Sequence, residues 1–396
     1  MEFTFRKYFT PVLLLFFFGS TTVVLNQERY KVPRKNDQAI SNQIKHVLRS
    51  LQHRYAPDLR LAVFDISPLQ VEQGTIVRGE VDNPDARRAV IRAMQKIVKD
   101  SVIDSIRVLP EPALGSHTMG IVLHRVADIR RKPGTREELL TQALMGTVVK
   151  LLKKEGSYFF VQTPDRYLGW LDTASVFVSD RAGVNAWNAA PKVIMTKFAG
   201  QLYAQPDTSS AAMCEIIDGC ILTKGSEKNG WRAVGLADGR IGFVQDSLVQ
   251  DFDEWNKSRI PTGEHLEQTA RSFLGIRYLW GGLSIQGMDC SGFVKTVYHM
   301  NGVELNRDAG QQARQGTRID PGEHFQNLKK GDLLFFGRKA TAQQGEHITH
   351  VALYLDNGLY IHSSNHVRLS SLYPSSEYFE EPLLKRFLCA RRILQN

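Results

Sequence analysis

Cysteine is scarce in this chain, and its scarcity excludes a disulfide-built protein. The sequence holds four cysteines among 396 residues, whereas small disulfide-stabilised scaffolds are much richer in them. Cys214 and Cys220 are close enough in sequence to form a local bridge, although two buried free thiols fit the same spacing. At least one of the four cysteines is therefore expected to have another purpose.

The N-terminal stretch lacks the roughly 20 consecutive apolar residues of a transmembrane helix. It has a basic start at Arg6 and Lys7, an apolar run that ends at Phe18, and small residues over 19–22. This pattern predicts a signal peptide over residues 1–21, with a retained membrane anchor as the alternative. No cysteine follows the run for lipid attachment, so we expect an exported protein of the periplasm or cell envelope.

Neither sign of charge dominates one part of the chain. Lysine and arginine number 50 against 41 acidic residues, and the net charge of +9 is spread along the sequence. We therefore expect mild attraction to an anionic wall or membrane surface, no nucleic-acid partner and no stable protein partner. A hydrophobic content of 42% and a charged content of 23% are typical of globular proteins. The length is sufficient for several domains.

Residues 34–112 predict a small α/β module. Two alternating apolar runs follow a first helical segment, and a second helix opens at Asn83 and Pro84, a favourable start because proline suits the first helical turn. A further apolar run closes the module. This order loosely resembles the BON-like modules of bacterial envelope proteins, and no catalytic constellation stands out in it.

The middle of the chain contains a repeat. Landmark residues recur at an offset of 73, as from Gly146 to Gly219 and from Trp170 to Phe243, which indicates two copies of one unit of short strands. The copies resemble bacterial Src-homology-3-like barrels, predicted over 117–180 and 190–250. The polar segment that follows, up to Pro261, is predicted to be a linker.

Cys290 is a candidate nucleophile. Apolar residues after it keep helical spacing, Asp289 is a good N-cap, and Asn301-Gly302 is a stop signal, so the cysteine lies in the first turn of a predicted helix. The positive end of the helix dipole is expected to lower the pKa of the thiol. A purely structural cysteine is the alternative.

The candidate base is His350, at the start of a predicted strand. A second strand carrying His362 follows the turn Asp356-Asn357-Gly358. A three-residue loop would pair Leu355 with Leu359 and place both histidines on one face, whereas a two-residue Asn357-Gly358 turn would send His362 to the other face. A Cys290-His350-His362 triad is thus predicted to require the three-residue loop.

A zinc site is the competing use of cysteine and histidine. The sequence has no close ligand pair of the C-x-x-C or H-E-x-x-H kind. We therefore expect no metal and no other cofactor.

Six motifs occur in order over residues 260–396: YLWGG, MDCSGFV, RDAGQQ, KKGDLLFFG, HVALYLDNGLYIHSS and VRLSSL. Their order resembles the NlpC family of cell-wall cysteine peptidases. The resemblance implies an α+β fold, with a papain-like catalytic domain preceded by the two barrels and the N-terminal module. It further implies Cys290 as nucleophile, His350 as base and His362 as the residue that orients the base. The implied reaction is hydrolysis of the γ-D-glutamyl to diamino acid bond in peptidoglycan stem peptides, by an endopeptidase or dipeptidyl-peptidase.

The resemblance also implies substrate contacts. Tyr278 would face the active site, and Asp289 and Ser291 would help to hold the substrate. In relatives with such barrels, Tyr278, Asp289 and residues of the first barrel help to recognise a free amine on the terminal L-Ala. Ala309 and Gly310 follow Asp308 here, where relatives often have serine or threonine.

Two other functions fit the same sequence. A wall-binding scaffold with a degenerate catalytic domain would keep the architecture without the activity. An amidase or acyltransferase of papain-like fold would keep the triad but change the acceptor.

Overall fold

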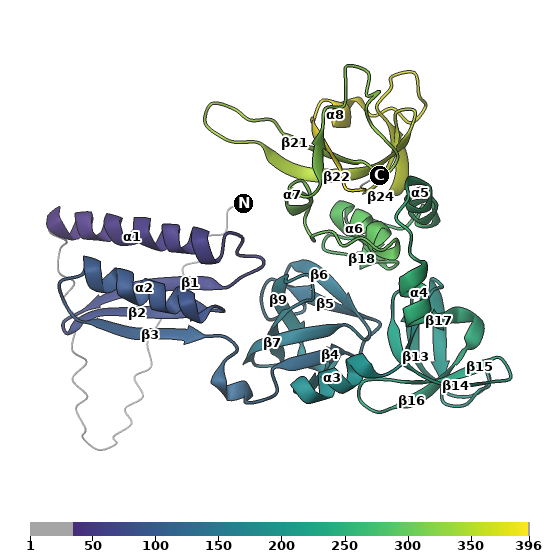
Figure 1. Ribbon diagram of the computed structural model, residues 1–396, viewed down its shortest axis with the longest axis horizontal. Helices are drawn as coiled ribbons and strands as arrows, with labels where there is room; N and C mark the ends of the chain where they lie inside the picture. The colour runs from purple at the N-terminus through teal and green to yellow at the C-terminus, as the bar shows by residue number, and fades with distance from the viewer. Residues whose placement is uncertain (1–34, 395–396) are drawn as a thin grey trace, which may run out of the picture.

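The computed structural model describes residues 35–394, so the predicted signal peptide lies outside the described residues. Figure 1 shows an α/β module, then two β-rich units, and a C-terminal domain above those units. We name the β-rich units the first β-unit (residues 119–179) and the second β-unit (residues 192–251). Among the described helices, none is long and apolar enough to cross a membrane.

The N-terminal module is a three-stranded sheet covered by two helices (Figure 1). Its elements are α1 (Lys35–Tyr55), β1 (Phe64–Val71), β2 (Gly74–Val81), α2 (Pro84–Ile97) and β3 (Val102–Val108). Strand β2 pairs antiparallel with β1 and parallel with β3. The helix start predicted at Asn83 is confirmed, because its side chain accepts a hydrogen bond from the backbone of Asp85. Val90 and Met94, one helical turn apart on α2, are fully buried against the sheet.

The repeat detected in the sequence recurs in the two β-units. The first consists of β4 (Met119–Val122), β5 (Val126–Arg130), β6 (Leu139–Leu144), β7 (Val148–Glu155), β8 (Tyr158–Gln162), β9 (Leu168–Asp172) and β10 (Val176–Ser179). The second consists of β11 (Lys192–Met195), β12 (Ala199–Tyr203), β13 (Ala212–Ile217), β14 (Ile221–Lys228), β15 (Trp231–Gly235), β16 (Ile241–Gln245) and β17 (Val249–Asp251).

The strands of the two units have the same order in their sheets, β10-β4-β7-β8-β9-β5-β6 in one and β17-β11-β14-β15-β16-β12-β13 in the other. The repeated glycines explain part of this agreement. Gly146 and Gly219 both adopt a positive φ, of 86° and 87°, a conformation that other residues rarely adopt. Both therefore mark the same tight turn before the fourth strand of each unit.

Two helices flank the second β-unit. Helix α3 (Arg181–Ala189) joins the units, and α4 (Phe252–Ser258) lies in the segment that we predicted to be a linker. The α4 helix forms because Asp251 caps it, its carboxylate accepting hydrogen bonds from the backbone N–H groups of Asp253 and Glu254. Single turns of 3-10 helix occur at Pro112–Leu114, Thr173–Ser175 and Asp246–Leu248.

All four cysteines have free thiols. Cys214 and Cys220 both pack in the core of the second β-unit. Burial raises the pKa of the Cys220 thiol to about 12, as expected for an inert structural cysteine. Of the two alternatives that the sequence left open, the structure contains the unbridged thiols.

The C-terminal domain packs helix α6 on a six-stranded sheet. Its helices are α5 (Gly263–Ser272), α6 (Cys290–Met300), α7 (Ala309–Gln312) and α8 (Glu381–Leu384). Its strands are β18 (Leu283–Ser284), β19 (Gly287–Met288), β20 (Thr317–Ile319), β21 (Leu333–Arg338), β22 (His347–Asp356), β23 (Leu359–Ser364), β24 (His366–Ser371) and β25 (Phe387–Arg392). The sheet order is β20-β25-β21-β22-β23-β24, with β18 and β19 forming a separate hairpin.

The core of this domain places the start of α6 beside the middle of the sheet. Val294 and Val297 of α6 are fully buried with Val351 and Leu353 of β22. This apolar contact fixes the helix against the strand that carries His350. Leu274 lies beyond the end of α5 at Ser272 and is 43% exposed.

Candidate active site

Cys290 is the first residue of α6, as predicted. Asp289 caps the helix, and its carboxylate accepts a hydrogen bond of 2.7 Å from the backbone N–H of Gly292. A larger residue would not fit at Gly292, because an added Cβ would lie 2.1 Å from the carbonyl oxygen of Gly282. The small residue that follows the thiol thus lets a second backbone segment approach the first turn of the helix.

The expected lowering of the thiol pKa was wrong. Burial and the charge of Asp289 raise the pKa of Cys290 to about 12. Hydrogen bonds from the backbone N–H groups of Val351 and Ser291 act in the opposite direction, as the helix start predicts. They are outweighed because the thiol is only 7% exposed. The resting sulfur is therefore protonated and needs a base to become a nucleophile.

The hairpin between β22 and β23 has a turn different from the one predicted. Asp356 pairs with Leu359, so the turn contains only Asn357 and Gly358, both with positive φ. The register then shifts at Leu355, which bulges out of the ladder, and Tyr354 pairs with Tyr360. The bulge restores the register that a three-residue loop would have given, because one extra residue on one strand reverses the change of face.

His362 consequently lies beside His350. The Nε2 atom of His350 is 2.7 Å from the Nδ1 atom of His362, and the Nε2 atom of His362 is 3.0 Å from the Ser370 hydroxyl. A base that accepts the thiol proton at Nδ1 must carry its own proton on Nε2, so we assign His350 as the donor to His362 and His362 as the donor to Ser370. The Nδ1 atom of His350 is then the acceptor left for the thiol of Cys290, whose sulfur lies near the backbone N–H of the adjacent Val351.

Both histidines are held in the neutral form. Burial and the positive charges of Arg386 and Arg368 lower the pKa of His350 to about 4. Burial, with the neighbouring His350 and Arg368, lowers the pKa of His362 well below its usual value. A neutral His350 is the form that can accept a proton, so the site pairs a neutral thiol with a neutral base.

These pKa values predict activity at unusually low pH. The acid limb of kcat/KM should lie well below pH 6.5 and approach the pKa of His350, about 4, because the free enzyme loses its base only when His350 is protonated. A pH profile of peptide hydrolysis measures this limb. Circular dichroism at each pH is the control, since folding stability falls as the pH drops from about 6.5 toward 4 while the unfolded chain takes up protons that the folded chain refuses. An acid limb at or above pH 6.5 in folded protein would contradict the prediction.

Asp289 is held by a buried arginine that the sequence analysis did not single out. Arg307 is 1% exposed and donates to both carboxylate oxygens of Asp289, at 3.0 and 2.7 Å. Its Nε donates to the Thr141 hydroxyl of the first β-unit at 3.0 Å. The arginine of the RD motif thus ties the residue before the thiol to the neighbouring unit.

The three predicted substrate-binding residues surround the thiol but differ in access. Tyr278 is half-buried, its backbone bridges to Met288 two residues before the thiol, and burial with the charges of Cys290 and Asp289 raises the pKa of its phenol. Ser291 is 5% exposed, donates to Asp289 at 3.1 Å and accepts from Arg307 at 3.1 Å. Asp289 and Ser291 therefore form part of a closed network, and Tyr278 is the most accessible of the three.

The first β-unit contributes further groups. Trp280 of the YLWGG motif donates from its indole to the Glu138 carboxylate at 3.1 Å. A hydrogen bond from Arg131 lowers the pKa of Glu138, so this carboxylate is ionised at neutral pH. Tyr167 is 4% exposed and donates to the Asp308 carboxylate at 2.9 Å. No sequence pattern pointed to these contacts, which join segments far apart in the chain.

The N-terminal module also contacts the C-terminal domain, at Asp308 and Gln311. In the loop between α1 and β1, Arg60 donates to Asp308 at 2.6 Å, and Asp58 accepts from Gln311 at 2.9 Å. Although burial raises it, hydrogen bonds from Arg60 and Gln311 hold the pKa of Asp58 below its usual value. The module thus contacts Asp308, the residue that follows Arg307.

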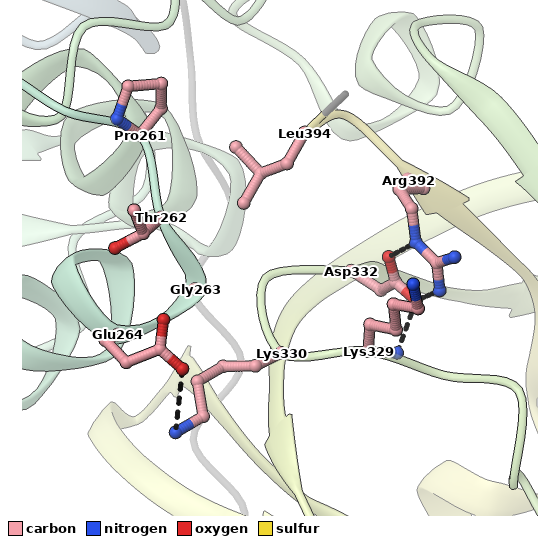
Figure 2. A pocket seen from close by; sticks show the side chains of 9 residues that line it. All are labelled: Pro261, Thr262, Gly263, Glu264, Lys329, Lys330, Asp332, Arg392 and Leu394. Atoms are coloured by element: carbon pink, nitrogen blue, oxygen red, sulfur yellow. Dashed lines mark hydrogen bonds and ion pairs between the residues drawn. The ribbon is translucent and has the colours of Figure 1, made fainter. Parts of the chain in front are cut away.

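A separate cavity of about 340 Å³ lies at the start of α5, away from the thiol and both histidines. Figure 2 shows Arg392 turned toward Asp332 and Lys330 toward Glu264. These charged groups of the cavity thus pair with each other where α5 meets the sheet. This cavity has no cysteine and no histidine among its lining residues.

Comparison with known proteins agrees with this geometry. Residues 275–389 match the NlpC/P60 family, and residues 129–176 match the bacterial dipeptidyl-peptidase Sh3 domain. Dipeptidyl-peptidase 6 of Lysinibacillus sphaericus is 32% identical over 273 residues, which cover 66% of this chain and 95% of the relative. The gamma-D-glutamyl-L-lysine dipeptidyl-peptidase of Bacillus cereus is 31% identical over 255 residues, covering 62% of this chain and 73% of the relative.

A solved structure extends the similarity to the fold. The crystal structure of a NlpC/P60 family protein from Bacillus cereus superimposes with a TM-score of 0.59 at 25% identity, covering 70% of this chain and 100% of that one. The motifs that carry Cys290, His350 and His362 all lie inside the residues that match the family. On its sequence, its fold and the arrangement of these side chains, the chain belongs to the NlpC/P60 family.

Proposed function

We propose that the protein is a cysteine peptidase that hydrolyses the γ-D-glutamyl to diamino acid bond of peptidoglycan stem peptides. The observation that carries this proposal is the 2.7 Å contact between the imidazoles of His350 and His362, on a strand whose next residue, Val351, has its backbone N–H at the thiol of Cys290. Relatives named as dipeptidyl-peptidases support the substrate class. A degenerate scaffold would have no need of two hydrogen-bonded imidazoles on the strands beside the thiol.

The reaction begins with transfer of the thiol proton to Nδ1 of His350. The sulfur attacks the γ-carbonyl carbon of D-glutamate, and the oxyanion that forms is stabilised by backbone N–H groups at the start of α6. When the carbon–nitrogen bond breaks, its electron pair stays on nitrogen, and the imidazolium of His350 protonates the leaving amine. Water then attacks the thioester with His350 again as base, which releases the glutamyl product and restores the thiol.

His362 serves as the orienting residue in this proposal. It accepts the Nε2 proton of His350 and passes a hydrogen bond to Ser370, so the ring of His350 is fixed with Nδ1 toward the sulfur. An aspartate or asparagine occupies this role in other triads. Because His362 is neutral, the thiol and both imidazoles carry no charge until His350 takes the thiol proton.

We further propose that the preferred substrates have a free N-terminal L-Ala. Acidic groups gather where the first β-unit meets the C-terminal domain, with Asp289, Asp308 and Glu138 from three separate segments. Asp289 is occupied by Arg307, and Asp308 is paired with Arg60. Glu138 is ionised and also pairs, with Arg131, but it lies exposed at the surface, so an ammonium can reach it and form a charge-assisted hydrogen bond.

The test compares a free stem peptide with a capped one. L-Ala-γ-D-Glu-L-Lys should be cleaved with a kcat/KM about 100-fold higher than its N-acetylated form, since the capped amine cannot form a charge-assisted hydrogen bond with the acid. The products are identified by mass. Glu138→Gln should narrow this ratio, and Glu137→Gln, at the neighbouring position, is the matched control. Equal cleavage of both peptides would refute the amine requirement, and cleavage of neither would refute the peptidase.

The domain layout and location belong to the same proposal. The second β-unit repeats the strand order of the first, which matches the Sh3 domain, so we propose a second copy of that domain. Relatives named as peptidoglycan enzymes, such as the murein DD-endopeptidase of Escherichia coli, act on the cell wall. An envelope location, reached through the signal peptide over residues 1–21, suits such a substrate.

A further inference from the structure

A cavity of about 280 Å³ opens beside His350, on strands β22 to β24 and the segment that leads into β25. Its lining residues include Thr349 and His350 with the charged side chains of Arg368, Glu380 and Arg386. Its lining residues do not include Cys290, the adjacent Asp289 or Tyr278. The cavity thus lies beside the imidazole of His350, and its lining does not include the acidic groups between the first β-unit and the C-terminal domain.

The chemistry of the proposed function decides which part of a substrate lies there. The imidazolium must give its proton to the leaving amine, so the leaving residue has to sit against His350. The acyl part, which stays on sulfur, extends toward Tyr278 and the first β-unit. At about 280 Å³ the cavity is slightly smaller than most sites for drug-sized ligands, which begin near about 300 Å³, and so is suited to one residue and not to a long peptide.

The charges of the cavity select the kind of residue. Arg368 forms an ion pair with Glu380, and the carboxylate of Glu380 also lies 3.8 Å from Nε2 of the neutral His362. Arg386 is exposed and donates to the neutral hydroxyl of Thr349 at 2.7 Å. Among the lining residues the charges of Arg368 and Glu380 therefore offset each other, Arg386 keeps a positive charge without an ion pair, and the second oxygen of Glu380 has only the neutral His362 nearby.

We propose that this cavity binds the leaving diamino acid, with Arg386 donating to a carboxylate of that residue and Glu380 facing its ammonium group. This inference rests on the proposed function. A guanidinium is suited to a carboxylate because its planar donors match the two oxygens. The carboxylate can be the α-carboxylate of a third residue at the end of the stem, or the side-chain carboxylate that diaminopimelate has and lysine lacks.

The experiment varies the leaving group. Four substrates share L-Ala-γ-D-Glu: two carry meso-diaminopimelate or L-lysine, one carries L-lysine amide, and one carries a γ-4-nitroanilide without carboxylate or ammonium. The full-length protein is compared with Arg386→Ala at about pH 7.5, where His350 is neutral in either protein because its pKa is far below. Arg318→Ala, on the edge strand β20 at the far side of the sheet, is the matched control.

The expected result is a change in the ratio of kcat/KM for the peptides to kcat/KM for the anilide. Arg386→Ala should lower kcat/KM for a carboxylate-bearing peptide, relative to kcat/KM for the anilide, by about 10- to 100-fold, the usual effect of losing one charge-assisted hydrogen bond. A loss with L-lysine but not with L-lysine amide identifies the α-carboxylate. A larger loss with diaminopimelate than with L-lysine identifies the side-chain carboxylate. Arg318→Ala should leave every ratio unchanged.

Two results would overturn the proposal. An equal change on the peptides and the anilide would mean that Arg386 acts through His350 and not on the substrate. Unchanged ratios would mean that the cavity does not bind the leaving residue. Failure of the proposed function would be distinct, because the wild-type protein would then cleave none of the four substrates, the anilide included, and the inference would fall with it.

Discussion

Cys290→Ala is expected to abolish peptide hydrolysis, with kcat/KM lowered by at least about 10,000-fold, as for other triad nucleophiles. The effect is large because the proposed route passes through a thioester, and neither histidine can form that bond. The fold should survive, since a buried thiol and a methyl group differ little in size and the neighbouring Asp289 keeps its cap to Gly292. Product release from L-Ala-γ-D-Glu-L-Lys, followed by mass, measures the loss.

Cys389→Ala is the matched control for this variant. Cys389 is a second buried cysteine of the same domain, on β25, and burial raises the pKa of its thiol as well. It has no histidine pair beside it, so its replacement should leave kcat/KM within about 2-fold of the wild type. Activity that persists in Cys290→Ala would contradict the nucleophile assignment and favour a different chemistry. Inactivity of both variants would point to lost folding and would be recognised by circular dichroism.

The histidine pair shows how far the sequence could lead. The alternation of apolar residues predicts the two strands, and the turn residues predict a hairpin. The turn type was wrong, since Asn357 and Gly358 form a two-residue turn. The side-chain geometry was nevertheless right because of the bulge at Leu355. A bulge of this kind depends on packing of the whole sheet, which has no local signature in the sequence.

The prediction that the helix start lowers the pKa of the Cys290 thiol was wrong for a related reason. The sequence places Cys290 at a helix start, and the N–H groups there do act on the sulfur as expected. Burial is set by elements elsewhere in the chain, here β22 and the segment that passes over Gly292. A dipole that a pattern predicts can thus be outweighed by a desolvation that it cannot predict.

Contacts between the units were the least predictable. Arg60 and Asp308 are 248 residues apart, and the arginine lies in a module that the sequence connected to no catalytic role. The RD motif was recognised by its order among the other motifs, whereas the partners of its arginine and aspartate come from three different units. Periodicity describes one element at a time, and such networks arise only when separate elements meet.

Arg307→Met is expected to lower the free energy of unfolding of the C-terminal domain by about 3–5 kcal/mol, because it leaves the buried carboxylate of Asp289 without its partner. Arg307 is 1% exposed and contacts both oxygens of that carboxylate. Activity should fall as well. Asp289 raises the pKa of Cys290 and Arg307 lowers it, so removing the arginine makes the thiol harder to deprotonate. Urea denaturation followed by domain-specific hydrogen exchange measures the stability.

The double variant Arg307→Met with Asp289→Asn tests whether the loss of stability comes from the unpaired charge of Asp289 or from the lost packing of Arg307. Without the carboxylate, no charge is left buried alone, so the double variant should be more stable than Arg307→Met even though it carries one more substitution. Asparagine can still accept the helix-capping hydrogen bond from Gly292, which keeps the start of α6 and the position of Cys290. If the double variant were instead as unstable as the sum of the two single variants, the pair would not be coupled, and the buried network would support the site only by packing.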